Sequence, residues 1–163
     1  MSARLRLELV DPAAQEAFGA RLAAACPPRV LVFLRGDLGA GKTTLVRGLL
    51  RALGETGPVR SPTYTLVEPY DTPAGRVYHL DLYRVADGEE LEYLGLREML
   101  EEQALILVEW PERGGDWLPR PDLLVDIGHL PAGRALTLEG LGERGERVIA
   151  ALEDRAGAPA GAP

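Results

Sequence analysis

The spacing of hydrophobic and polar positions in the first third of the chain alternates between strand-like and helix-like. Apolar and charged side chains alternate over residues 5–9, which predicts a half-buried strand or an extended arm. Asp11, followed by a proline, marks the start of a helix that ends before Cys26. A continuous apolar run over residues 30–34 predicts a buried strand, and the apolar spacing over residues 42–53 predicts a second helix.

The rest of the chain continues in the same two spacings. Strands are expected over residues 66–70, 77–83, 104–108, 123–127 and 135–139, and helices over residues 88–102 and 146–155. A turn rich in proline and glycine joins the first two of these strands into a hairpin. We therefore expect a single α/β domain over residues 1–155, followed by a disordered low-complexity tail over residues 156–163.

Residues 36–43 read Gly-Asp-Leu-Gly-Ala-Gly-Lys-Thr between a predicted strand and a predicted helix, which is the context of a phosphate-binding loop. Its glycines let the backbone turn its N–H groups toward an anion, and the positive end of the following helix adds to that field. We expect Lys42 to reach the β- and γ-phosphates of a nucleotide, Thr43 to offer a hydroxyl to Mg²⁺, and Thr44 to offer one nearer the α-phosphate. The expected nucleotide contacts are Asp37, Leu38, Gly39, Ala40, Gly41, Lys42, Thr43 and Thr44.

Lys42 is the only lysine in the chain, and apart from two histidines every other basic side chain is an arginine. A slim, mobile ammonium group fits between phosphates better than a planar guanidinium group does. We therefore interpret the single lysine as functional. The chain also has no asparagine, so the Asn-Lys-x-Asp string that usually selects guanine is absent, which favours ATP over GTP.

The overall composition is that of an acidic globular protein with a substantial core. Hydrophobic residues make up 46% of the chain and charged residues 26%, and the net charge is −7 with a pI near 4.9. Phosphate contacts require a basic surface, so strong binding to nucleic acid by the chain alone is not expected. No apolar run approaches the length of a membrane span, no secretory signal is present, and the lone Cys26 offers no disulfide framework. We expect a cytoplasmic protein without membrane association.

Two carboxylates on predicted strands form a second group of candidate residues. His79 and Asp81 share one face of a predicted strand, and in nucleotide hydrolases this part of the chain often senses the γ-phosphate and Mg²⁺. Asp81 and Thr63 are therefore candidates, with a structural His79–Asp81 hydrogen bond as the alternative. Glu109 ends the apolar run over residues 104–108, where phosphate-loop folds carry an acid for Mg²⁺ or for the attacking water. Because tryptophan follows Glu109, either Glu109 has both roles or it shares them with Asp81.

Four strings, in this order and spacing, resemble the signatures of TsaE (YjeE), the bacterial ATPase family of tRNA threonylcarbamoyladenosine synthesis. They are the phosphate loop over residues 36–44, Ser61-Pro62-Thr63-Tyr64-Thr65, His79-Leu80-Asp81-Leu82-Tyr83-Arg84, and Val108-Glu109-Trp110-Pro111-Glu112. The resemblance covers nearly the whole chain except the tail. It implies a P-loop NTPase-like mixed β-sheet flanked by helices on both faces, with ATP and Mg²⁺ bound at the loop.

The resemblance also implies partners and residue roles. In the TsaE family, ATP hydrolysis is thought to reset a transferase, the TsaB–TsaD complex, which attaches a threonylcarbamoyl group to N6 of adenosine 37 in tRNA. By this resemblance Thr43 and Glu109 are ligands of Mg²⁺, directly or through water, and Asp81 belongs to the hydrolytic site. Asp11 and Arg134 are implied as contacts on the adenine side of the nucleotide.

The expected mechanism is in-line attack of water on the γ-phosphate. Lys42 and Mg²⁺ offset the developing charge and Glu109 or Asp81 orients the water, so these three side chains are the expected catalytic residues. We see no arginine in an obvious position to act as a finger, so hydrolysis by the chain alone should be slow. A small-metabolite kinase is the alternative function, although the loop over residues 111–121 holds only two arginines for a lid. A nucleotide-binding module that does not hydrolyse is a further alternative.

Overall fold

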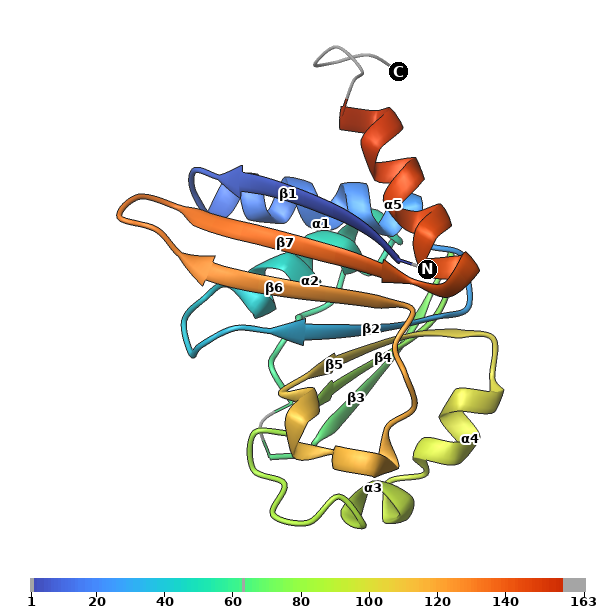
Figure 1. The fold of residues 1–163 in the computed structure, drawn as a ribbon. Coiled ribbons are helices and arrows are strands. Elements are labelled where there is room, and N and C mark those ends of the chain that lie inside the picture. The colour runs from blue at the N-terminus through green and yellow to red at the C-terminus, as the bar shows by residue number, and fades with distance from the viewer. Residues whose placement is uncertain (1, 63, 157–163) are drawn as a thin grey trace.

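The computed structural model describes residues 2–62 and 64–156, and within these ranges seven strands form one mixed sheet in the order β1-β7-β6-β2-β5-β4-β3 (Figure 1). The strands are β1 (Ser2–Leu9), β2 (Val30–Arg35), β3 (Val67–Thr72), β4 (Gly75–Asp81), β5 (Ala104–Glu109), β6 (Leu123–His129) and β7 (Arg134–Leu141). The helices are α1 (Pro12–Ala25), α2 (Lys42–Ala52), α3 (Glu90–Tyr93), α4 (Leu96–Glu101) and α5 (Gly142–Ala156), with 3₁₀ helices η1 (Pro111–Arg113) and η2 (Gly115–Trp117).

The centre of the sheet is parallel and its margins are antiparallel. Strands β6, β2, β5 and β4 run parallel to one another, whereas β7, β1 and β3 are antiparallel to the strands beside them. Parallel strands end at the same edge, and in this register Glu109 pairs with Leu34 on one side and with Asp81 on the other. The ends of β2, β4 and β5 therefore bring the phosphate loop and both predicted carboxylates to one edge.

Helices cover both faces of the sheet, as Figure 1 shows. Alternate side chains of β2 point to opposite faces: Val32 packs with α1, α2 and α5, whereas Leu31 packs with α3 and α4. Burial on both faces explains why β2 and β5 are continuous apolar runs without alternation. The predicted α/β fold, a mixed sheet with helices on both sides, is confirmed.

Helices α1 and α2 pack backbone to backbone on one face of the sheet. A Cβ atom added at Gly48 of α2 would lie 2.0 Å from the carbonyl oxygen of Glu16, and one added at Gly19 of α1 would lie 2.2 Å from that of Leu45. No side chain larger than hydrogen fits at either position without a shift of backbone. This close crossing holds α1 against the helix that follows the phosphate loop.

Two predicted helices differ from the structure. The predicted helix over residues 88–102 is wrong in its continuity: it is two short helices, α3 and α4, interrupted at Gly95, whose φ of 84° is left-handed. The last helix begins at Gly142, four residues earlier than the predicted residue 146. Of the two alternatives for the first segment, the half-buried strand is confirmed, since this segment is β1, which pairs with β7. The candidate Thr63 and residues 157–163 of the predicted tail over residues 156–163 lie outside the described residues, and Ala156 ends α5.

Among the described residues, none of the helices combines the length and the apolar character that a membrane crossing requires.

Candidate active site

The phosphate loop joins β2 to α2 in a conformation that only glycine adopts readily. Gly39 and Gly41 have φ values of 80° and 101°. A Cβ atom at Gly41 would in addition lie 2.2 Å from the amide oxygen of Gln15, so a side chain there would force Gln15 to move as well as straining the backbone. No side chain caps the N-terminus of α2, which leaves its first N–H groups for an anion.

The ammonium group of Lys42 is held between this loop and the end of β5. Lys42 is 5% exposed, and its Nζ donates to the carbonyl oxygen of Gly36 at 2.6 Å. The same nitrogen lies 3.9 Å from Oε1 of Glu109 and 4.1 Å from the ring centroid of Trp110. Burial lowers the pKa of Lys42, and the charges of Glu109 and Asp81 oppose that shift. An ammonium group has three donors, so two remain for phosphate oxygens.

Two buried carboxylates face the loop from adjacent strands. Asp81 and Glu109 are 5% and 3% exposed and occupy paired positions on β4 and β5. The hydroxyl of Ser61 donates to Oδ2 of Asp81 at 2.9 Å, and the backbone N–H of Tyr83 donates to Oδ1 at 3.0 Å. Nε2 of His79 lies 2.5 Å from Oε2 of Glu109. The alternative of a His79–Asp81 hydrogen bond is wrong, because the ring of His79 bonds to Glu109.

These groups surround a cavity of about 370 Å³ beside the loop. Eight of its lining residues were predicted from the sequence, and they are Leu38, Gly39, Gly41, Lys42, Thr43, Thr44, Asp81 and Glu109. No pattern in the sequence predicted that the other three, Ser61, Tyr83 and Trp110, would line the cavity. A triphosphate fits the chemistry of this cavity, since hydroxyls, loop N–H groups and one ammonium group face acids across it.

Four predicted contacts lie apart from the cavity wall. Asp37 is exposed, and Ala40 is a fully buried residue of the loop that packs against the core. Asp11 caps α1, where its carboxylate accepts a hydrogen bond from the backbone N–H of Ala14 at 2.8 Å. Arg134 lies on β7 beside the loop. A role of any of these residues in nucleotide binding stays a prediction.

Arg134 binds the phosphate loop from outside the cavity. Its Nε donates to the carbonyl oxygen of Ala40 at 3.0 Å, and an Nη atom donates to that of Gly39 at 3.2 Å. The buried side chain of Gln15 lies 3.4 Å from the same Ala40 oxygen. Hydrogen bonds from a guanidinium group are the stronger kind, so Arg134 holds these carbonyls outward and leaves the loop N–H groups to face the cavity. No pattern in the sequence singled out Gln15.

We expect Arg134→Leu to weaken binding of both ATP and inorganic tripolyphosphate by about tenfold, because losing two charge-assisted hydrogen bonds loosens the loop that receives the phosphates. Calorimetric titration with each ligand measures this, and Arg97→Leu is the matched control, since Arg97 is exposed and, within residues 2–62 and 64–156, forms an ion pair with Glu92 on α3 alone. Weaker binding of ATP with unchanged binding of tripolyphosphate would instead favour the adenine-side role that the family resemblance implies.

Trp110 lines the cavity and has a backbone conformation that is unusual for a residue with a side chain. Its φ of 55° and ψ of 49° are left-handed, a conformation that costs a side chain about 1–2 kcal/mol. This turn directs the indole ring over the Lys42 ammonium group, and the Tyr83 ring lies 5.1 Å away. The string around Glu109 contains Trp110, but its role as part of the wall depends on a backbone angle that the sequence does not reveal.

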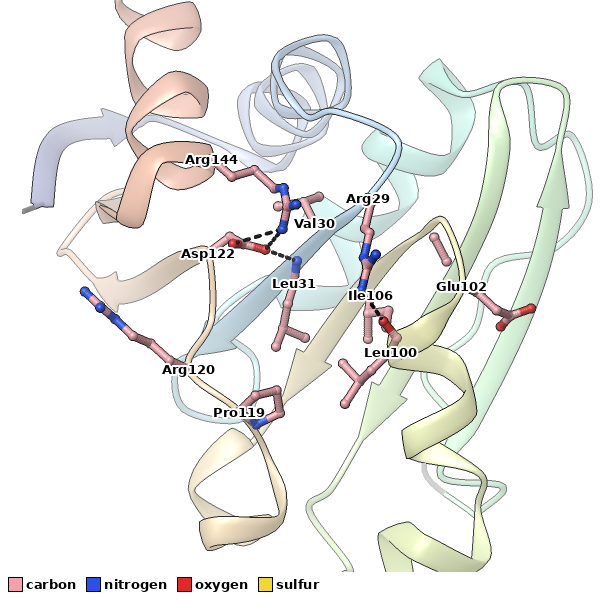
Figure 2. A pocket seen from close by; sticks show the side chains of 11 residues that line it. Arg29, Val30, Leu31, Leu100, Glu102, Ile106, Pro119, Arg120, Asp122 and Arg144 are labelled. Carbon is pink, nitrogen blue, oxygen red and sulfur yellow. Dashed lines mark hydrogen bonds and ion pairs between the residues drawn. The ribbon is translucent and has the colours of Figure 1, made fainter.

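A second cavity, of about 210 Å³, lies at the opposite edge of the sheet, where β2 and β5 begin (Figure 2). Its polar groups hold chain segments together. Asp122 accepts from the backbone N–H of Leu31 at 2.8 Å and lies 3.4 Å from Arg144, while Arg29 donates to the carbonyl oxygen of Leu100 at 2.9 Å. Ligands of open parallel sheets bind where the strands end. The loop cavity is therefore the better candidate for the active site.

The chain is similar to one family of known proteins in both sequence and structure. The model of the family "Threonylcarbamoyl adenosine biosynthesis protein TsaE" matches residues 9–136. The tRNA threonylcarbamoyladenosine biosynthesis protein TsaE of Haemophilus influenzae is 46% identical over 125 residues, which cover 77% of this chain and 79% of that protein. The protein of the same name from Bacillus subtilis is 37% identical over 152 residues, covering 91% and 94%. The crystal structure of B. subtilis YdiB superposes with a TM-score of 0.81 at 32% identity, covering 96% of this chain and 98% of YdiB.

Proposed function

The chain belongs to the TsaE family of threonylcarbamoyl adenosine biosynthesis proteins, and on that premise we propose that it is a Mg²⁺-dependent ATPase that supports threonylcarbamoyl transfer to adenosine 37 of tRNA by the TsaB–TsaD complex. One observation carries the proposal. Lys42, the only lysine of the chain, lies at the N-terminus of α2, and its Nζ is 3.9 Å from the buried carboxylate of Glu109 at the end of β5. This is the arrangement that phosphoryl transfer in phosphate-loop enzymes requires.

Each part of the cavity has a role in this proposal. The loop N–H groups and Lys42 bind the β- and γ-phosphates and offset the negative charge that develops on the γ-phosphate as water attacks. Thr44 lies nearer the α-phosphate. Glu109 is the first candidate to orient the water, because Asp81 already accepts hydrogen bonds on both of its oxygens.

The residues at the cavity fit a magnesium ion that is bound together with a nucleotide. The described part of the chain holds no group of three or more His, Cys, Asp or Glu side chains able to bind a metal ion by themselves. Thr43 and Glu109 would hold the ion, with phosphates and water supplying its other oxygen ligands, as is usual for Mg²⁺. Bound there, Mg²⁺ would supply charge stabilisation to the phosphates.

The composition of the wall supports dependence on a partner. Among the described residues that line the cavity, Lys42 is the one cationic side chain, and no arginine is among them. In phosphate-loop hydrolases an arginine supplied by a partner can raise the rate greatly. We propose that the TsaB–TsaD complex completes the site, and that hydrolysis resets that complex between rounds of transfer.

We expect ATP hydrolysis by this chain to rise at least tenfold when TsaB–TsaD is added, because the complex supplies or orders the missing charge. Release of inorganic phosphate, measured with and without the complex, tests this. The Lys42→Ala protein mixed with the same complex is the control for contaminating ATPases. An unchanged rate would contradict partner dependence.

A panel of small-metabolite acceptors, assayed without the complex, tests the alternative of a kinase. Transfer of the γ-phosphate to any acceptor faster than to water would favour the kinase over the proposed hydrolase.

A further inference from the structure

The carboxylate of Glu109 presents its two oxygens to different partners. Oε2 lies 2.5 Å from Nε2 of His79, whereas Oε1 lies 3.9 Å from Nζ of Lys42 on the cavity side. A glutamate side chain has several rotatable bonds, and holding it in one orientation costs conformational entropy that a favourable contact must offset. The contact with His79 provides that restraint.

His79 is built into the sheet on the same face as this carboxylate. It lies two residues before Asp81 on β4, so it shares the face on which Asp81, Glu109 and helix α2 lie. It is fully buried, and β4 has a neighbouring strand on each side, β3 and β5. The ring therefore has no route to solvent.

The hydrogen bonds of the His79 ring indicate which of its two nitrogens carries the proton. Among the described residues, Nδ1 of His79 is buried and has no hydrogen-bond partner. A buried N–H without an acceptor is costly, so the proton lies on Nε2 and His79 donates it to Glu109. A neutral imidazole that donates to a carboxylate is a recurrent way to orient a metal or substrate ligand.

We infer that His79 is a positioning residue, whose Nε2–H binds Oε2 of Glu109 and thereby aims Oε1 at Lys42 and the phosphate cavity. His79 itself does not line the cavity, so it acts through Glu109. The inference rests on the proposed function, because it assigns to Glu109 a role in holding Mg²⁺ with the nucleotide.

Variants at His79 separate positioning from folding. His79→Leu removes the donor and keeps an apolar side chain of similar reach, whereas His79→Gln puts an amide N–H at the position of Nε2. We expect His79→Leu to raise the Mg²⁺ concentration needed for half-maximal binding of a non-hydrolysable ATP analogue by about 10- to 100-fold and to lower kcat more than it changes KM. Binding of the analogue in EDTA should stay within about twofold of the wild-type protein, and His79→Gln should restore the Mg²⁺ response.

Val77→Ala is the control for damage to the core. Val77 is buried on the same face of β4, and its apolar side chain cannot donate a hydrogen bond to Glu109. If the leucine variant fails to fold, His79→Asn replaces it, since its amide nitrogen is one bond too short to reach Glu109.

A Mg²⁺ response of His79→Leu equal to that of the wild type, or a glutamine variant as impaired as the leucine variant, would overturn the inference. A wild-type protein that binds the analogue equally in Mg²⁺ and in EDTA would contradict the proposed function, and the inference with it.

Discussion

Replacing Lys42 by alanine is expected to lower ATP hydrolysis by about three orders of magnitude and to weaken ATP binding, because Lys42 is the only ammonium group at the cavity. We expect the variant to bind phosphate groups more weakly, with no change in its binding of the nucleoside. Tripolyphosphate should therefore lose as much affinity as ATP does, and adenosine should bind the variant and the wild-type protein equally. A Lys42→Ala protein that still supports tRNA modification at the normal rate would contradict the central claim.

Lys42→Arg keeps the positive charge and isolates the effect of shape. A planar guanidinium group is wider than an ammonium group, and Lys42 lies between the Gly36 carbonyl and the Trp110 ring, at 2.6 Å and 4.1 Å. We expect Lys42→Arg to recover little of the lost hydrolysis. Full recovery would mean that charge alone, without the fit of the ammonium group, accounts for the role of Lys42.

Lys42→Met separates loss of function from loss of folding. Burial lowers the pKa of Lys42, so below that pKa the folded protein carries the cost of a buried charge. The free energy of unfolding should rise as the pH rises through the folded pKa toward the ordinary value of 10.5, and this rise should be absent in Lys42→Met. Urea unfolding of the wild type and of Lys42→Met at several pH values measures these free energies. We expect the methionine variant to be no less stable than the wild type at neutral pH.

Much of the fold and the main chemistry of the site could be predicted because they depend on short stretches of sequence. The apolar runs of β2 and β5 identify buried parallel strands, and such strands end at one edge. The glycine pattern before Lys42 and the acid at the end of β5 are therefore brought together by any parallel pairing of these strands. Only the register remained to be found, and it pairs Glu109 with Leu34.

The contacts that support the site could not be predicted because they join distant parts of the chain. Arg134 and Ala40 are separated by 94 positions, and their contact depends on how β7 pairs with β6 at one end of the sheet. A hydrogen bond between His79 and Asp81 was an open alternative, but the ring of His79 bonds to Glu109, which the register between β4 and β5 places beside Asp81. The break of the helix at Gly95 likewise reflects packing of two short helices on the sheet, which overrides the continuous helical spacing.

At saturating Mg²⁺, Glu109→Gln is expected to retain ATP binding within a few-fold and to lose about 10² to 10⁴ in the rate of hydrolysis, because the amide keeps the shape of the carboxylate but not its charge. The amide oxygen can still accept the hydrogen bond from His79, so folding should change little. Single-turnover hydrolysis and equilibrium binding of ATP, measured on the same preparation, separate chemistry from binding. Normal single-turnover hydrolysis by the variant would contradict a role for this acid in the chemical step.

Asp81→Asn, compared with Glu109→Gln, decides which acid orients the attacking water. Both oxygens of Asp81 already accept hydrogen bonds, from Ser61 and from the backbone of Tyr83, whereas Oε1 of Glu109 accepts none among the described residues and faces Lys42. A carboxylate whose two oxygens already accept hydrogen bonds has fewer lone pairs left to bind a water molecule in line with the γ-phosphate. We therefore expect the larger loss of hydrolysis from Glu109→Gln, with Asp81→Asn acting mainly on the order of the segment around Ser61. The opposite ranking in single-turnover rates, with both variants folded, would assign the water to Asp81 and leave Glu109 as a ligand of the metal.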